Sequence, residues 1–121
     1  LNLGGLAIEQ GKALYAQAFF LENLALSQDM GEKIDVIYSI SGLAAAAAML
    51  SNPSRAVRLA AAADTQRLGM GAAWDLLEGR IFHRTLNLLQ TGLSDTEFKA
   101  AWTAGEKMTL DEAAALASAE V

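Results

Sequence analysis

The sequence contains no cysteine, one proline and one histidine. The absence of cysteine excludes disulfide bonds, thiolate chemistry and zinc sites built on cysteine, and it fits a reducing, cytoplasmic location. The histidine, His83, has no convergent partners at a spacing that would make it a metal ligand or a general base. We therefore expect no enzyme activity, no cofactor and no bound metal.

Positive charge is also scarce, because 9 Lys and Arg residues face 14 Asp and Glu residues and the net charge is −5. Such a chain has no general attraction for nucleic acid or for an anionic membrane. We expect Arg55, Arg58 and Arg67 to pair with nearby carboxylates rather than to bind nucleic acid. The longest apolar stretch, residues 40–50, includes five consecutive alanines and falls well short of the roughly 20 residues that a membrane span needs.

Hydrophobic residues make up 53% of the chain, and their excess is alanine rather than isoleucine, valine or phenylalanine. Alanine has the highest helix propensity, and no segment alternates for long enough to predict a strand, so the composition predicts an all-α fold. The length predicts a single domain, residues 1–121. Because the chain starts at Leu1 inside a helical pattern, without an initiator methionine, we expect a fragment of a longer protein.

Glycine and capping residues mark the boundaries of the first four predicted helices. Glycine is suited to the left-handed conformation that follows a helix end, and proline is tolerated at the first helical position. Helices joined by so few residues fold back as hairpins. The predicted helices are residues 1–10 ending at Gly11, 13–30 ending at Gly31, 33–50, and 53–69 with Asn52 as N-cap and Pro53 at the first position.

The second half of the chain predicts three more helices. Residues 71–90 carry a wide apolar face that includes Trp74 and Ile81, and they contain Gly79 as a potential break. Each of the last two helices opens with a capping box, in which a Ser or Thr and a Glu three residues later satisfy each other's backbone donors. These boxes are Ser94 with Glu97, and Thr109 with Glu112.

A shift of 40 residues aligns the start of the chain with the alanine-rich segment. In this alignment, small residues of one segment match small residues of the other, which indicates helices that approach closely where their axes cross. The aligned pairs are Leu3 with Leu43, Gly4 with Ala44, Ala7 with Ala47, Gly11 with Ser51, and Ala16 with Ala56.

These residues resemble the tetratricopeptide repeat (TPR), although the period is longer than its usual length of about 34 residues. The resemblance implies stacked antiparallel helical hairpins, a TPR-like α-solenoid of about two repeats, with repeats at residues 1–30 and 33–69 and C-terminal capping helices at 70–121. The matching positions are Leu3, Gly4, Gly11, Ala16 and Phe20 in the first unit, and Leu43, Ala44, Ser51, Ala56 and Ala60 in the second.

Two further segments, residues 54–70 and 98–117, resemble the stretches that close repeat arrays in large bacterial multidomain regulators of the LuxR type or with an NTPase module. That resemblance implies an interaction or regulatory module in transcription regulation or signal transduction. The sequence contains no NTP-binding motif and no DNA-reading domain, so neither activity is assigned to it.

The resemblance places the inner surface of the array on residues 1–10 and 33–50, where we expect a protein or interdomain partner to bind. No cationic cluster is evident there, so we expect a shallow apolar groove that does not recognise a charged peptide end. The predicted partner-binding residues are Ile8, Tyr38, Ser41, Ala45 and Met49.

Other chemistry-bearing residues have structural interpretations. Trp74 and Trp102 are expected in the core, and the acidic residues Asp29, Glu32 and Asp35 form a solvated connector without the spacing of a calcium loop. The favoured function is a non-catalytic interaction module, and the alternative is a small-molecule effector sensor that regulates an attached output domain. We also expect self-association through the exposed end of the array.

Overall fold

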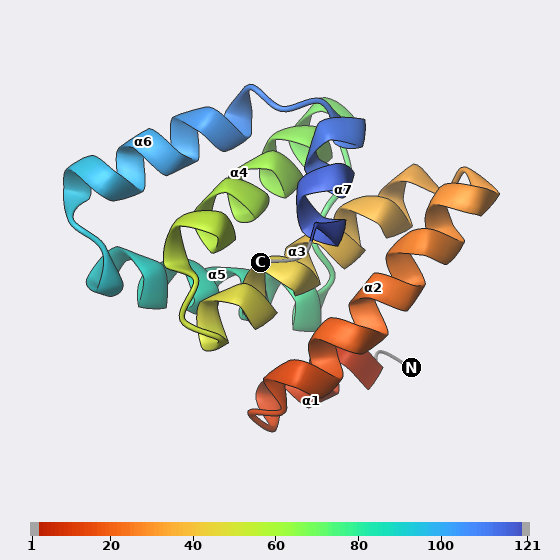
Figure 1. The fold of residues 1–121 in the computed structure, drawn as a ribbon. Coiled ribbons are helices and arrows are strands. Elements are labelled where there is room, and N and C mark those ends of the chain that lie inside the picture. The colour runs from red at the N-terminus through yellow and green to blue at the C-terminus, as the bar shows by residue number, and fades with distance from the viewer. Residues whose placement is uncertain (1–2, 120–121) are drawn as a thin grey trace.

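A computed structural model describes residues 3–119, so Leu1, where the first helix is predicted to begin, lies outside the described residues. Within that range the chain forms seven helices and no strand, which confirms the all-α prediction (Figure 1). The helices are α1 (Leu3–Glu9), α2 (Ala13–Met30), α3 (Lys33–Met49), α4 (Pro53–Gly69), α5 (Leu76–Gly92), α6 (Asp95–Glu106) and α7 (Leu110–Ser118).

Most predicted helix boundaries are confirmed, and both capping boxes are present. The start of the fifth helix was wrong: α5 begins at Leu76 rather than at residue 71, because the side chain of Asp75 caps it by accepting a hydrogen bond from the backbone N–H of Glu78. Trp74 therefore precedes the helix, and Gly79 lies within it without breaking it. The predicted N-cap Asn52 makes no side-chain capping hydrogen bond.

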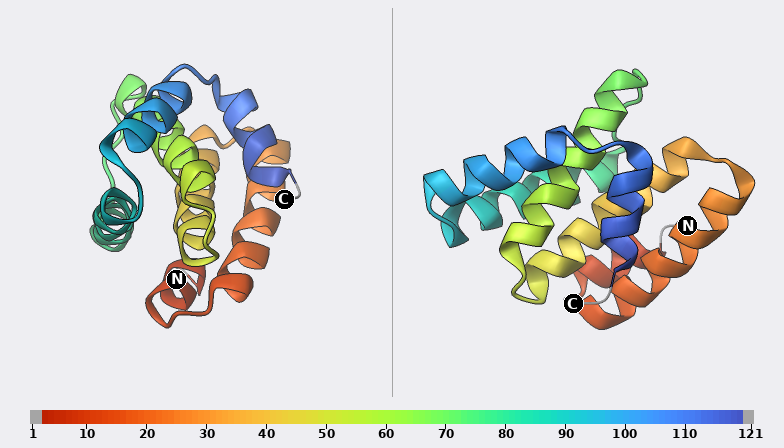
Figure 2. Two further views of the ribbon diagram at one scale, coloured as in Figure 1. Left: turned by 60° about the vertical axis from the view of Figure 1, so that its left-hand side comes forward. Right: turned by 45° about the horizontal axis from the view of Figure 1, so that its top comes forward.

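Helix α3 is surrounded by other helices. It packs against α1, α2, α4, α5 and α7, which come from both ends of the chain (Figures 1 and 2). Every residue from Ser39 to Ala47 is buried, so no side of this part of the helix faces solvent. A helix in that position must be apolar or small all round, and the alanine run meets this requirement.

Small residues also let Phe20 of α2 insert between two other helices. The ring of Phe20 lies against Gly4 of α1 and Gly42 of α3, and a Cβ atom added to Gly4 would be only 2.6 Å from the ring. Any larger residue at either glycine would displace this ring. Its insertion joins α1, α2 and α3 around a single aromatic side chain.

The first four helices end in turns of one geometry. At intervals of 20 residues, Gly11, Gly31, Ser51 and Gly71 adopt φ angles of 75°, 70°, 62° and 66°. At each turn the next residue donates its backbone N–H to a carbonyl five residues back, at 2.9 to 3.1 Å, which is the Schellman pattern. Helix and turn therefore recur as a unit across this half of the chain.

Helices α6 and α7 complete the fold by packing on α4. The Arg55 guanidinium donates to the carbonyl oxygens of Ala117 and Ala119, at 3.2 and 2.8 Å, and so caps the end of α7. Burial lowers the pKa of Arg55, with Arg58 adding to the effect. Arg55 was predicted to pair with a nearby carboxylate, but it donates to backbone carbonyl oxygens at the end of α7.

Gly105 marks the closest approach of α6 to α4. A Cβ atom at this position would overlap the backbone carbonyl oxygen of Arg58 and lie 2.7 Å from the Cβ of Ala61. Because backbone cannot move aside as a flexible side chain does, we expect Gly105→Ala to lower the free energy of unfolding by about 2 to 3 kcal/mol. Chemical denaturation measures the change.

Gly92 offers the matched control, since a Cβ atom there meets nothing within 4 Å. Gly92→Ala should change the free energy of unfolding by less than about 1 kcal/mol. Equal losses in the two variants would contradict the close packing of α6 on α4.

Candidate binding site

The predicted partner-binding face of α3 is largely covered by the chain itself. Ser41 and Ala45 are 7% and 2% exposed, and helix α5 packs against α3. At one end of this face the Tyr38 hydroxyl donates to the carbonyl oxygen of Ala73 at 2.9 Å. The sequence predicted a shallow apolar groove on this face, and residues 72–92 lie over much of it.

Trp74 closes the same end of the face. Its ring stacks on Phe82 at 5.0 Å and lies 5.8 Å from the ring of Tyr38. The guanidinium of Arg67 sits 5.0 Å from the Trp74 ring centre and donates to the carbonyl oxygen of Ala72 at 2.8 Å. Cation–π and aromatic contacts therefore fasten the segment before α5 to α3 and α4.

A pocket remains at the other end of the face, where α1, α3 and α5 meet. It has a volume of about 300 Å³, and three of the five predicted residues, Ile8, Ala45 and Met49, line it. Tyr38 and Ser41 do not. Partner binding by these five residues stays a prediction. The pocket is completed by Glu9, Gly11, Ala48, Arg84, Thr85 and Leu88; we call it the inner pocket.

Two arginines of α5 reach Glu9 beside the inner pocket, and of these Arg84 lines the pocket. Nη2 of Arg80 is 2.6 Å from one carboxylate oxygen of Glu9, and Nη1 of Arg84 is 3.8 Å from the other. Both arginine side chains are about half exposed, so each pair stabilises the fold by less than about 1 kcal/mol. The spacing of Arg80 and Arg84, four residues apart on one helix, already placed them on one face.

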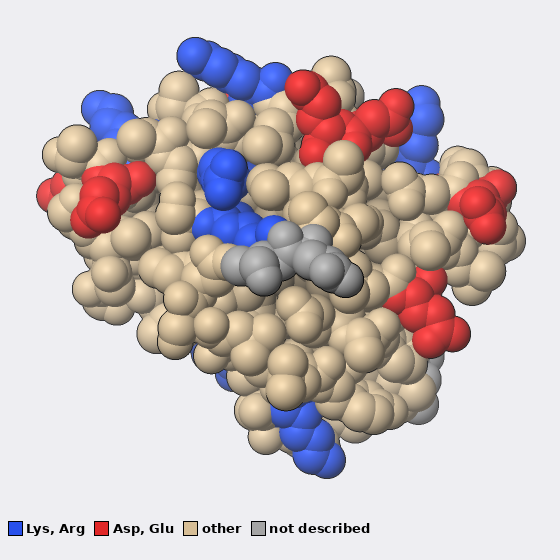
Figure 3. All heavy atoms as spheres, viewed as in Figure 1, with Lys and Arg blue, Asp and Glu red and all other residues tan. Residues whose placement is uncertain are grey.

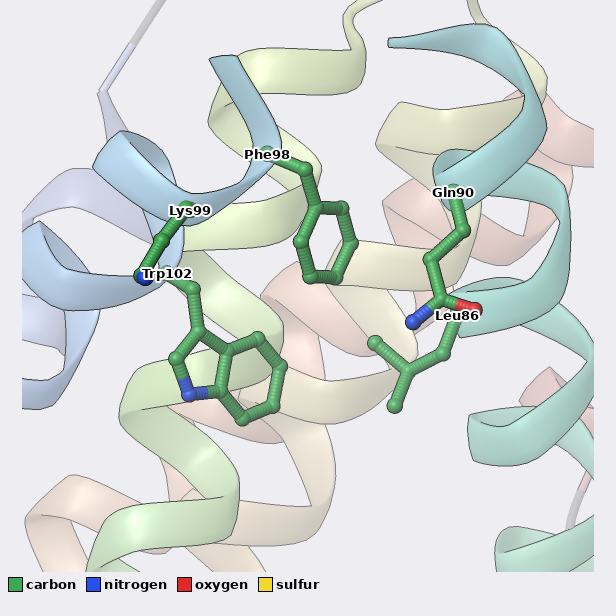
Figure 4. A pocket seen from close by; sticks show the side chains of 5 residues that line it. All are labelled: Leu86, Gln90, Phe98, Lys99 and Trp102. Carbon is green, nitrogen blue, oxygen red and sulfur yellow. The ribbon is translucent and has the colours of Figure 1, made fainter. Parts of the chain in front are cut away.

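A second pocket, of about 420 Å³, lies between α5 and α6 and was not predicted (Figure 4). Phe98 and Trp102 stack at 5.9 Å on its α6 side, facing Leu86 and Gln90 on α5. Lys99 stands at its edge. Trp102 was predicted as a core residue, and it both packs against the core and lines this opening. We call it the outer pocket.

Carboxyl groups gather beside Trp74. Burial raises the pKa of the Glu78 carboxyl from 4.5 to about 7, and the neighbouring carboxyl groups of Asp75 and Asp35 add to the shift. Burial and the same carboxyl groups raise the pKa of Tyr38 as well. The Glu78 carboxyl, with its pKa of about 7, therefore changes charge near neutral pH.

Among residues 3–119, no group of three or more His, Asp or Glu residues is arranged to hold a metal ion. His83 is exposed and lies edge-on to Phe82. On the face in Figure 3, basic and acidic side chains are scattered among uncharged atoms. None of the described helices combines the length and hydropathy of a membrane span.

The Glu78 cluster predicts a specific pH dependence of stability. Because the folded-state pKa of about 7 exceeds the unfolded value near 4.5, the folded protein binds the proton more tightly. Stability from this group is full below pH 4.5 and is lost as the pH rises to 7. Glu78→Gln should flatten that loss and raise the free energy of unfolding above pH 7 by on the order of 1 kcal/mol, allowing for partial exposure.

Denaturation at several pH values tests this, with Glu106→Gln as the control because Glu106 is an exposed acidic residue. The difference between wild type and Glu78→Gln should grow between pH 4.5 and 7. The same growth in the Glu106→Gln variant would attribute it to net charge and not to the cluster.

Comparison with known proteins returns no match: no protein-family model, no curated protein and no solved structure is significantly similar to this chain. The resemblance to repeat arrays of bacterial regulators therefore stays a prediction, and the assignment of function depends on the geometry of the chain.

Proposed function

We propose that this chain is a non-catalytic helical-repeat module of a bacterial transcriptional or signalling regulator, and that it acts through protein or interdomain contacts. It is proposed to form a TPR-like array of about two repeats, residues 1–30 and 33–69, with capping helices at 70–121. The observation that carries the proposal is the recurrence of one turn geometry every 20 residues.

The two hairpin turns aligned by the 40-residue shift agree in detail. The backbone N–H of Lys12 donates to Ala7, and that of Asn52 donates to Ala47, both at 2.9 Å. Ser51 adopts a positive φ angle where the first unit has glycine. A residue other than glycine rarely takes this conformation, which supports two copies of one structural unit.

Helix α2 provides the surface for such contacts. Leu14, Tyr15, Leu26 and Met30 are 57 to 70% exposed, while the opposite side of the same helix packs against α3. Large apolar side chains that share an exposed helix face are typical of interaction surfaces. In a repeat array, another helical hairpin covers the end face. In the isolated chain, a second copy of the same chain can cover this face instead.

Self-association tests this surface. Sedimentation velocity of the isolated chain should show a dimer, and Leu26→Glu should weaken it by about tenfold or more, because a buried charge replaces an apolar contact. Leu76→Glu is the control, since Leu76 is 86% exposed but lies on α5. A chain that stays monomeric at high concentration, or equal weakening by both variants, contradicts the proposal.

The outer pocket favours a second function, a sensor domain for a small-molecule effector that regulates an attached NTPase or DNA-binding output. Its volume of about 420 Å³ falls within the range of small-molecule sites, and its lining is mostly apolar with a few polar groups. Gln90 and Lys99 supply those polar groups beside two aromatic rings. An effector that binds one conformation of the protein more tightly than another shifts the equilibrium between the two conformations.

A thermal-shift screen against metabolites tests the sensor function. A ligand at about 100 times its Kd should stabilise the folded chain by about 2.7 kcal/mol. A ligand of the outer pocket should lose this effect in Lys99→Ala but keep it in Arg84→Gln, which alters only the inner pocket. A screen without any stabilising compound counts against the function.

A further inference from the structure

We propose that the inner pocket binds a small apolar monocarboxylate, and that Glu9 occupies the place of the ligand's carboxylate when the pocket is empty. The proposal goes beyond the sensor function, which concerns the outer pocket, and assigns a ligand class to a second pocket. It does not depend on the self-association of α2.

The body of the pocket is suited to a hydrocarbon group. Ile8 and Ala45 are 6% and 2% exposed, and Met49 and Leu88 line the pocket from α3 and α5. Burying apolar ligand surface against such side chains is favourable in proportion to the area removed from water. Methionine adapts its shape, so the pocket accepts ligands that differ in branching.

The polar end of the pocket is suited to one carboxylate. Arg84 is the only cation that lines it within the described chain, and the Thr85 side chain lies beside it on α5. A guanidinium binds a carboxylate through two parallel N–H donors. At 3.8 Å from Glu9, Arg84 is beyond hydrogen-bond distance of that carboxylate, so its donors are open to a ligand.

Glu9 shows where a carboxylate rests at this site. Arg80 holds one of its oxygens at 2.6 Å, and this contact keeps the other oxygen within reach of Arg84. A ligand carboxylate that pairs with Arg84 must take this place from Glu9, against the repulsion of its negative charge. Removal of that charge therefore strengthens ligand binding, and removal of Arg84 weakens it.

Octanoate is a suitable probe, with octanol as the neutral analogue and octylammonium as the cationic one. The methyl resonance of Met49, assigned in a methyl-labelled sample, reports on the inner pocket. We expect octanoate to shift this resonance with higher affinity than octanol, and octylammonium to bind most weakly. Glu9→Gln should tighten octanoate binding severalfold, and Arg84→Gln should reduce it to the affinity of octanol.

The proposal is overturned if octanoate and octanol bind the wild type with equal affinity, or if Glu9→Gln leaves the affinity for octanoate unchanged. Glu9 and Arg84 are partly exposed, so both variants should fold, and circular dichroism verifies this. Arg84→Lys keeps the charge but loses the paired donors, and it should fall between wild type and Arg84→Gln. A different compound that stabilises the chain through Lys99 would leave the sensor function standing while octanoate fails.

Discussion

The burial of α3 on all sides is the constraint on which the rest of the structure depends. Five helices pack around it, and from Ser39 to Ala47 it has no solvent-facing side. Alanine and glycine fit there because bulkier residues would push the surrounding helices apart. In return, the close approach lets larger side chains such as Phe20 and Leu24 fill the spaces between helices. The alanine run of α3 therefore lies at the centre of the core, where its small side chains are required by packing.

The same constraint decides where binding can occur. Since α5 packs on the face of α3 that an open array would leave free, only the inner pocket remains of the predicted groove. Its lining combines the apolar wall of α1 and α3 with a cation from α5. The exposed apolar face lies on α2, and the outer pocket lies between α6 and a neighbouring part of α5. The inner pocket, the outer pocket and the exposed face of α2 thus lie around one buried helix. The two pockets are of a size for small molecules, and the face of α2 is suited to another helix.

Local signals predicted the helices well, because glycine turns and capping boxes act within a few residues of the backbone they shape. The predicted start of α5 was wrong because Asp75 caps the helix while Trp74 is held outside it by Phe82 and Arg67. The candidate site was predicted in part: Ile8, Ala45 and Met49 do meet in one pocket. Which helix would cover α3 depends on long-range packing, and no local pattern reveals it.

The central position of α3 also shapes how the chain acquires its structure. Helices α1 to α4 can pair as hairpins between sequence neighbours, but α3 is covered only when α5 and α7 arrive from the distant C-terminal half. Such non-local contacts must overcome loop-closure entropy before they contribute stability. We therefore expect folding to be concentrated in one cooperative step, and the amide protons of α3 to exchange with solvent only when the whole domain opens.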